Sequence, residues 1–154
     1  MFLKKNEFLI SFIWGFILAV WSLFSSFFFY YKLNISIGRN QKDIENDYLA
    51  IIFIAPFLET ILFNSFVYYI LIKLKIVKKW QIIVISTLLF SVSHFQNLYL
   101  IFVTIPVGLL FSTRYYNLSM KYNEFFSTAN IIFSHMVMNI SILLFKIYFI
   151  NHFQ

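Results

Sequence analysis

The stretch YLAIIFIAPFLETILFNSFVYYILIKL, residues 48–74, decides the fold. It is apolar over more than the roughly 18 residues that mark a membrane-spanning helix, although it carries one acid, Glu59, near its middle. The run ends in a cluster of positive charge made by Lys73, Lys75, Lys78 and Lys79. This pattern predicts a transmembrane helix that stops at a membrane surface.

Similar apolar runs lie on both sides of this stretch. They cover about residues 8–31, 80–95, 98–111 and 125–150. The middle two are short and are predicted to be joined by a tight turn at Gln96 and Asn97, and the polar residues 32–47 are predicted to form a loop. The sequence therefore predicts an all-α fold, a polytopic membrane helix bundle of about five transmembrane helices that forms a single membrane-embedded domain over residues 1–154.

The composition supports the same class. Hydrophobic residues make up 61% of the chain and charged residues 12%, whereas a soluble domain carries about 25% charged residues. There is no cysteine, which excludes disulfides, thiolate metal sites and a cysteine nucleophile. The net charge of +6 is spread over the ends of the apolar runs, which favours contact with membrane lipid and gives no indication of a nucleic acid partner.

Four polar side chains inside or at the ends of the apolar runs are the candidates for function. An ionisable group inside a membrane costs several kcal/mol, so such residues usually belong to a site or a pathway. The candidates are Glu59, His94, His135 and Asn139. His135 and Asn139 are four residues apart and share one face of the last predicted helix.

The depths of these residues agree with one another. Glu59 precedes Lys73 by fourteen residues, and His135 follows Lys121 by fourteen. His94 follows Lys79 by fifteen. At about 1.5 Å per residue, all three lie roughly 21 Å from the surface that the lysines mark. We therefore expect Glu59, His94 and His135 to meet around one small polar cavity, with Asn139 within a turn of it.

Three short motifs give the chain a family resemblance. Residues 59–64 read ETILFN, residues 90–94 read FSVSH and residues 135–139 read HMVMN. They resemble, in order, the motifs EExxxR, FxxxH and HxxxN of the CPBP family of intramembrane proteases, which includes CAAX-processing endopeptidases and bacteriocin-processing or immunity proteins. The resemblance covers about residues 48–149.

The resemblance implies glutamate-dependent hydrolysis of a peptide bond, without a cofactor. Glu59 would be the base that activates a water molecule, and His94 would hold that water or share its proton. His135 and the amide of Asn139 would stabilise the tetrahedral oxyanion. The substrate would be a peptide or protein. Ser93 and Ser134 precede the histidines, but neighbours in a helix are not expected to face each other.

The first motif departs from the family pattern at two positions. Thr60 replaces the second acid, and Asn64 replaces the arginine. The two lost charges are opposite in sign and four residues apart, so the replacement leaves a neutral pair and strands no buried charge. We assign Thr60 and Asn64 to structural support, and Phe90 to packing.

Two other classes of function remain open. Glu59, His94 and His135 could instead supply three ligands of a zinc ion and leave one coordination position for water. The protein could also be a bacteriocin immunity factor that acts by binding, without catalysis. A transporter is disfavoured because the short helices show no repeat.

The charge bias predicts the orientation of the chain in a bacterial cell membrane. With the N-terminus in the cytoplasm, eight Lys and Arg residues lie inside and four outside. The inner residues are Lys4, Lys5, Lys73, Lys75, Lys78, Lys79, Arg114 and Lys121, and the outer ones are Lys32, Arg39, Lys42 and Lys146.

We therefore expect the loop that contains Lys75 to be cytoplasmic and the C-terminus to be external. An enzyme reporter that is active only outside the cytoplasm should be active when fused after Gln154 and inactive when fused after Lys75. A reporter after Gln154 that works only in the cytoplasm would contradict this orientation.

Overall fold

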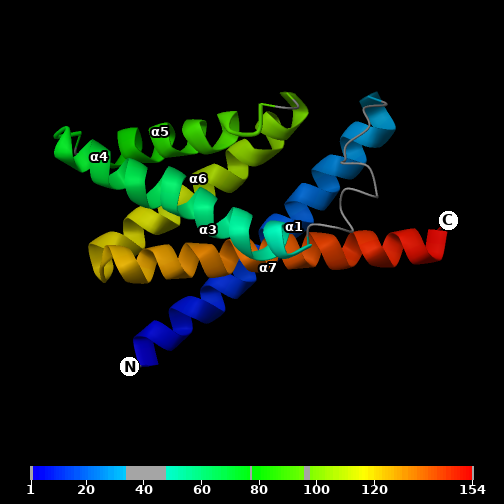
Figure 1. Cartoon of the computed structure of the whole chain (residues 1–154), viewed down its shortest axis with the longest axis horizontal. Coiled ribbons are helices and arrows are strands. Elements are labelled where there is room, and N and C mark those ends of the chain that lie inside the picture. Colours follow the sequence, from blue (N-terminus) through cyan, green and yellow to red (C-terminus); the bar gives the residue numbers. More distant parts are fainter. Residues whose placement is uncertain (1, 34–47, 77, 96–97, 154) are drawn as a thin grey trace. The chain divides into compact units, whose positions relative to one another are not determined.

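The computed structural model describes residues 2–33, 48–76, 78–95 and 98–153, and the regular elements in these ranges are all helices (Figure 1). Their order is α1 (Phe2–Leu33), η1 (Ala50–Ile54), α3 (Ala55–Thr60), η2 (Ile61–Phe66), α4 (Val67–Lys73), α5 (Lys79–Val92), α6 (Leu98–Lys121) and α7 (Glu124–Phe153). The elements named η are π-helical turns inside one helix that runs from Ala50 to Lys73.

Four helical segments among the described residues are long and apolar enough to cross a membrane. They are Asn6–Phe28, Ala50–Lys73, Leu98–Lys121 and Glu124–Tyr148. The apolar helix α5 is shorter, at 14 residues. The prediction of an all-α, multi-pass membrane bundle is confirmed.

Three predicted helix ends differ from the structure. The first helix was expected to begin near Phe8, but α1 begins at Phe2. The fourth helix was expected to end near Phe111, but α6 continues to Lys121. It continues because Phe111, Tyr115 and Leu118 form a buried stripe at helical spacing, while Asn117 is exposed on the other side. The third helix was expected to reach about Phe95, but α5 ends at Val92. The predicted turn at 96–97 and most of the predicted loop at 32–47 lie outside the described residues.

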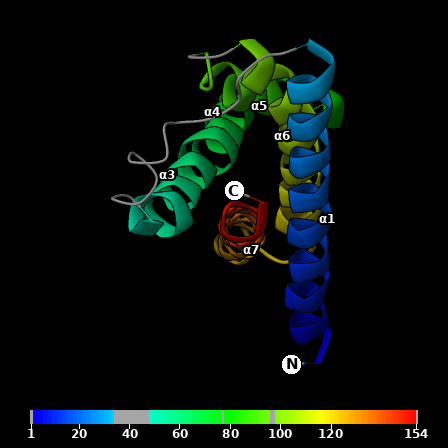
Figure 2. The same ribbon diagram turned by 90° about the vertical axis from the view of Figure 1, so that its right-hand side faces the viewer.

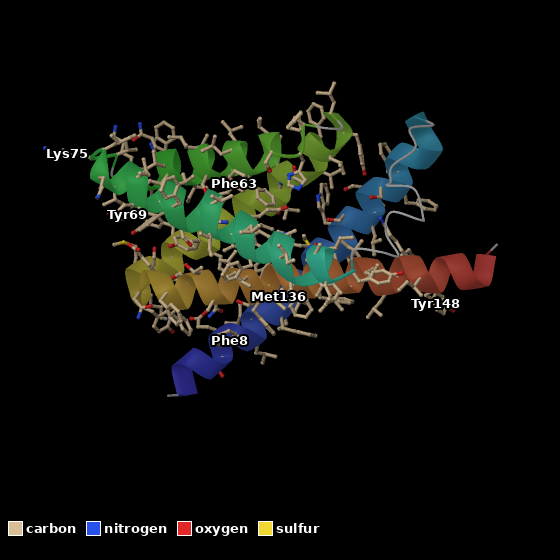
Figure 3. All side chains as sticks on the ribbon, in the orientation of Figure 1. Phe8, Phe63, Tyr69, Lys75, Met136 and Tyr148 are labelled. Carbon is tan, nitrogen blue, oxygen red and sulfur yellow. The ribbon has the colours of Figure 1, made fainter. Side chains whose placement is uncertain are left out.

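The turn after α4 has a well-defined hydrogen-bond pattern. The N–H of Ile76 donates to the carbonyl of Leu71, and that of Lys75 donates to Ile72. Lys75 has a φ of 59°, so this is a Schellman C-cap with lysine at the position that usually holds glycine. The cap reverses the chain directly into α5, and Lys75 lies at this end in Figure 3.

The start of α7 is capped by Asn123. Its Oδ1 accepts a hydrogen bond from the N–H of Phe126, and its carbonyl accepts one from the N–H of Ser127. Asparagine is a preferred N-cap because its side chain satisfies an N–H that the helix leaves unpaired. The cap allows α7 to start with only two residues between it and the end of α6.

The chain divides into two compact units. Unit 1 consists of Met1–Pro56 and Phe133–Gln154, and unit 2 of Phe57–Ile132. In unit 2, α5 and α6 pack closely against each other (Figure 1), and Figure 2 shows the same two helices foreshortened. A Cβ atom added to Gly108 would lie 2.9 Å from Cδ1 of Phe90, so glycine permits this close approach.

In unit 1, α1 packs against the second part of α7. The Ser134 hydroxyl donates to the carbonyl of Ser11 at 2.9 Å, and the rings of Phe8 and Phe133 meet edge to face with centroids 5.7 Å apart (Figure 3 labels Phe8). A Cβ atom at Gly15 would overlap the carbonyl oxygen of Ser134 and lie 2.9 Å from Cβ of Val137. The two backbones therefore meet at Gly15.

We expect Gly15→Ala to destabilise the protein by about 1–3 kcal/mol, because the new methyl group meets backbone that cannot move without shifting a helix. Gly108→Ala is the matched control: its new methyl group would meet the Phe90 side chain at 2.9 Å and backbone no closer than 3.3 Å, so the loss should be smaller. The measurement is unfolding in mixed detergent micelles by circular dichroism. Equal losses for the two variants would contradict this account of the α1 and α7 contact.

Candidate active site

The helix that carries Glu59 presents its polar residues on the side that packs inward. Glu59 lies in α3 and is partly buried, while Thr60 is 1% exposed and Asn64 is 3% exposed. Phe57, Leu58 and Leu62 on the same helix are exposed, as expected for a lipid-facing side. Thr60 and Asn64 of the first motif therefore face the protein interior.

Asn64 is bound within unit 2. Its Oδ1 accepts a hydrogen bond from the Ser112 hydroxyl of α6 at 3.3 Å. The hydroxyl of Thr60 is also buried, and no hydrogen-bonding group among the described residues contacts it. The two positions at which the chain departs from the family pattern thus differ in their hydrogen bonding. Asn64 links two helices, whereas Thr60 contributes packing alone.

The helices of the first and second motifs are joined through Phe63. Its ring meets that of Phe90 edge to face, with centroids 6.1 Å apart, and its carbonyl accepts a hydrogen bond from the Ser86 hydroxyl. Phe63 is labelled in Figure 3. The two helices are antiparallel across the α4 to α5 turn, so Glu59 and His94 each lie one turn beyond this contact, away from the turn.

Phe90 holds the second motif together. It is 3% exposed, and its ring also packs on those of Phe111 and His94, with centroids 6.3 and 5.2 Å away. Its backbone carbonyl lies 3.0 Å from Nδ1 of His94. A carbonyl can only accept, so this bond needs the proton on Nδ1 and leaves Nε2 as the nitrogen with a lone pair. The ring is therefore fixed in the tautomer that can accept a proton from water at Nε2.

The expectation for Ser93 was wrong. Its hydroxyl lies 3.2 Å from Nδ1 of His94 and also donates to the carbonyl of Phe90 at 2.7 Å. The reason is that α5 ends at Val92, so Ser93 and His94 belong to a turn and no longer point apart as neighbours in a helix do. The contact orients the imidazole and makes no nucleophile, because the hydroxyl proton is directed to a carbonyl.

The third motif lies on α7 in unit 1. His135 is 4% exposed. Asn139 is partly buried, and its Nδ2 donates to the backbone carbonyl of Ile51 at 2.8 Å. An amide nitrogen carries two N–H groups, so this bond uses one donor and leaves another.

The structure places the candidates in two groups. Glu59 and His94 belong to unit 2, together with Thr60, Asn64 and Phe90, whereas His135 and Asn139 belong to unit 1. Convergence of all four residues on one cavity stays a prediction. So does the alternative zinc site, because its three ligands are divided between the two units.

Sequence reasoning missed three residues that hold the candidates in place. Ser112 binds Asn64, Ser86 binds the carbonyl of Phe63, and the Ile51 carbonyl binds Asn139. Serine in an apolar run is too common to single out Ser112 or Ser86. The Ile51 contact could have been predicted from Pro56, because a proline inside a membrane helix deprives a nearby carbonyl of its hydrogen-bond donor.

One comparison with known proteins identifies a match. The model of the family described as type II CAAX prenyl endopeptidase Rce1-like matches residues 46–141, which include all three motifs. No curated protein and no solved structure matches the chain.

The two departures in the first motif should respond differently to substitution. Asn64→Leu should lower the free energy of unfolding by about 1–3 kcal/mol, because it removes the acceptor of a buried hydroxyl. Thr60→Val keeps the shape of the side chain and removes a hydroxyl that bonds no described group, so the change should stay within about 0.5 kcal/mol. Unfolding by SDS in micelles measures both. A larger loss for Thr60→Val than for Asn64→Leu would contradict the assignment.

Proposed function

The chain belongs to the type II CAAX prenyl endopeptidase Rce1-like family, and we propose that it is an intramembrane endopeptidase in which Glu59 activates the attacking water. The observation that carries the proposal is that the family match covers three motifs in which Glu59, His94, His135 and Asn139 are all present. The substrate is a peptide or protein, and the enzyme acts in the bacterial cell membrane as a multi-pass protein.

The proposed reaction needs no covalent intermediate. The Glu59 carboxylate takes a proton from water as the water oxygen attacks the peptide carbonyl carbon. Nε2 of His94 accepts a hydrogen bond from the same water and orients it. The negative charge that develops on the carbonyl oxygen is stabilised by His135 and by the second N–H of Asn139. Glu59 then passes its proton to the leaving nitrogen as the carbon–nitrogen bond breaks.

The neutral first motif is compatible with turnover. In the family pattern, an acid and an arginine occupy the positions of Thr60 and Asn64, one turn apart. Here Asn64 accepts a hydrogen bond from Ser112 and no charge is buried at either position, which supports a site in which Glu59 acts without the pair. No cofactor is required by this mechanism.

We expect purified protein in lipid to cleave members of a peptide library, offered with and without a C-terminal prenylated cysteine. Glu59→Gln keeps the shape of the side chain and removes the base, so turnover should be abolished. Asn139→Ala removes one oxyanion donor and should lower kcat on the order of 100-fold. Thr60→Val, outside the reacting set, is the control and should retain turnover.

The outcomes separate the three classes of function. Turnover that survives Glu59→Gln would refute the glutamate mechanism. Loss of turnover with a chelator, restored by zinc, would assign Glu59, His94 and His135 to a metal site. Protection of cells against a bacteriocin that persists in Glu59→Gln at equal protein level would identify an immunity factor that binds without catalysis.

A further inference from the structure

Pro56 lies in the second position of α3, three residues before Glu59. Proline has no backbone N–H, so the helix has no donor at this position. The preceding turn is η1, in which the N–H of Ala55 donates to the carbonyl of Ala50 rather than to that of Ile51. This is the five-residue spacing of a π-helix, which often occurs at functional sites.

The carbonyl of Ile51 consequently loses both donors that a helix could offer. In an α-helix it would accept from residue 55, but that N–H is directed to Ala50. In a π-helix it would accept from residue 56, which is proline. A backbone carbonyl without a donor is costly in a membrane, where water does not replace the missing partner.

Asn139 supplies the donor that the helix lacks. Its Nδ2 lies 2.8 Å from the Ile51 carbonyl oxygen, and both residues belong to unit 1. The contact is therefore more than a general polar link between helices, because the acceptor exists as a consequence of Pro56 and the η1 turn. The third motif is bound to the chain immediately before the first.

The same bond sets the rotation of α7 about its axis. The face of α7 that carries Ser134 and Val137 packs on α1 at Gly15. Asn139 lies on roughly the opposite side of the helix and binds Ile51 there. These two contacts hold α7 on two sides and define its rotation about its axis. His135 lies one turn before Asn139 on the same face, so its direction is fixed as well.

We propose that Pro56 is a positioning residue: by freeing the Ile51 carbonyl, it anchors one N–H of Asn139 and so orients the other N–H, and His135, for the reaction. This deepens the proposed function and rests on it. The anchor itself is a structural property that can be measured without any substrate.

The test is a double-mutant cycle between Pro56→Ala and Asn139→Ala, measured as the equilibrium constant of unfolding in micelles. In the wild-type background, Asn139→Ala should raise this constant about three- to tenfold, because it removes one hydrogen bond between helices. In the Pro56→Ala background residue 56 regains an N–H that can bind the Ile51 carbonyl at the π-helical spacing, so the same substitution should change the constant less than about twofold.

The other proline of the chain is the matched control. Pro106 lies inside α6, and its missing N–H concerns the carbonyl of Phe102, so Pro106→Ala and Asn139→Ala should act additively. Additive effects of Pro56→Ala and Asn139→Ala would overturn the anchor whatever the activity of the protein. If Pro106→Ala were coupled to Asn139→Ala as strongly as Pro56→Ala is, the anchor would be overturned too.

The kinetic arm distinguishes positioning from stability. Pro56→Ala should lower kcat about tenfold and leave KM unchanged, because a misdirected oxyanion donor acts in the transition state alone. Unchanged kcat with the stability coupling present would refute the positioning role and leave the anchor. Absence of turnover in the wild type would instead be a failure of the proposed function, and the stability cycle would still decide the anchor.

Discussion

Satisfaction of backbone hydrogen bonds in lipid is the constraint on which this structure depends. A carbonyl without a donor cannot turn to water in the hydrocarbon region, so helices are obligatory and every interruption needs a side chain. The Ile51 carbonyl follows this rule, because it accepts a hydrogen bond from Asn139. Two further links between helices also run from a side chain to backbone: Ser86 donates to the carbonyl of Phe63, and Ser134 donates to that of Ser11. Polar side chains in this chain thus hold helices together by binding backbone, and the candidate site is built on the same principle.

The closest contacts between helices occur at glycine residues. Without a hydrophobic driving force between helices in lipid, van der Waals contact and hydrogen bonds carry association. Gly15 lets α1 reach the backbone of α7, and Gly108 lets α5 and α6 meet at Phe90. Phe90 also links this core contact to a candidate residue, because its ring packs on His94 and its carbonyl lies within hydrogen-bond distance of Nδ1 of that histidine.

The first motif shows how a charged pair can be replaced. Asn64 is bound by Ser112, and Thr60 is buried with no hydrogen-bonding partner among the described residues. Neither arrangement buries a charge, so no buried ion needs a partner at these two positions. A glutamate mechanism in this chain would therefore depend on Glu59 and the third motif and would not use a supporting ion pair.

The sequence by itself determined the membrane class, the family, and the residues Glu59, His94, His135 and Asn139 as candidates, because run length, charge at run ends and motif order are local properties of a chain. It could not place the end of α6, where a buried stripe carries the helix ten residues past Phe111. Nor could it show that Ser93 contacts His94, or that Asn139 binds Ile51. Only the tertiary structure decided these points, because each depends on which partner from a distant part of the chain satisfies a polar group or covers an apolar one.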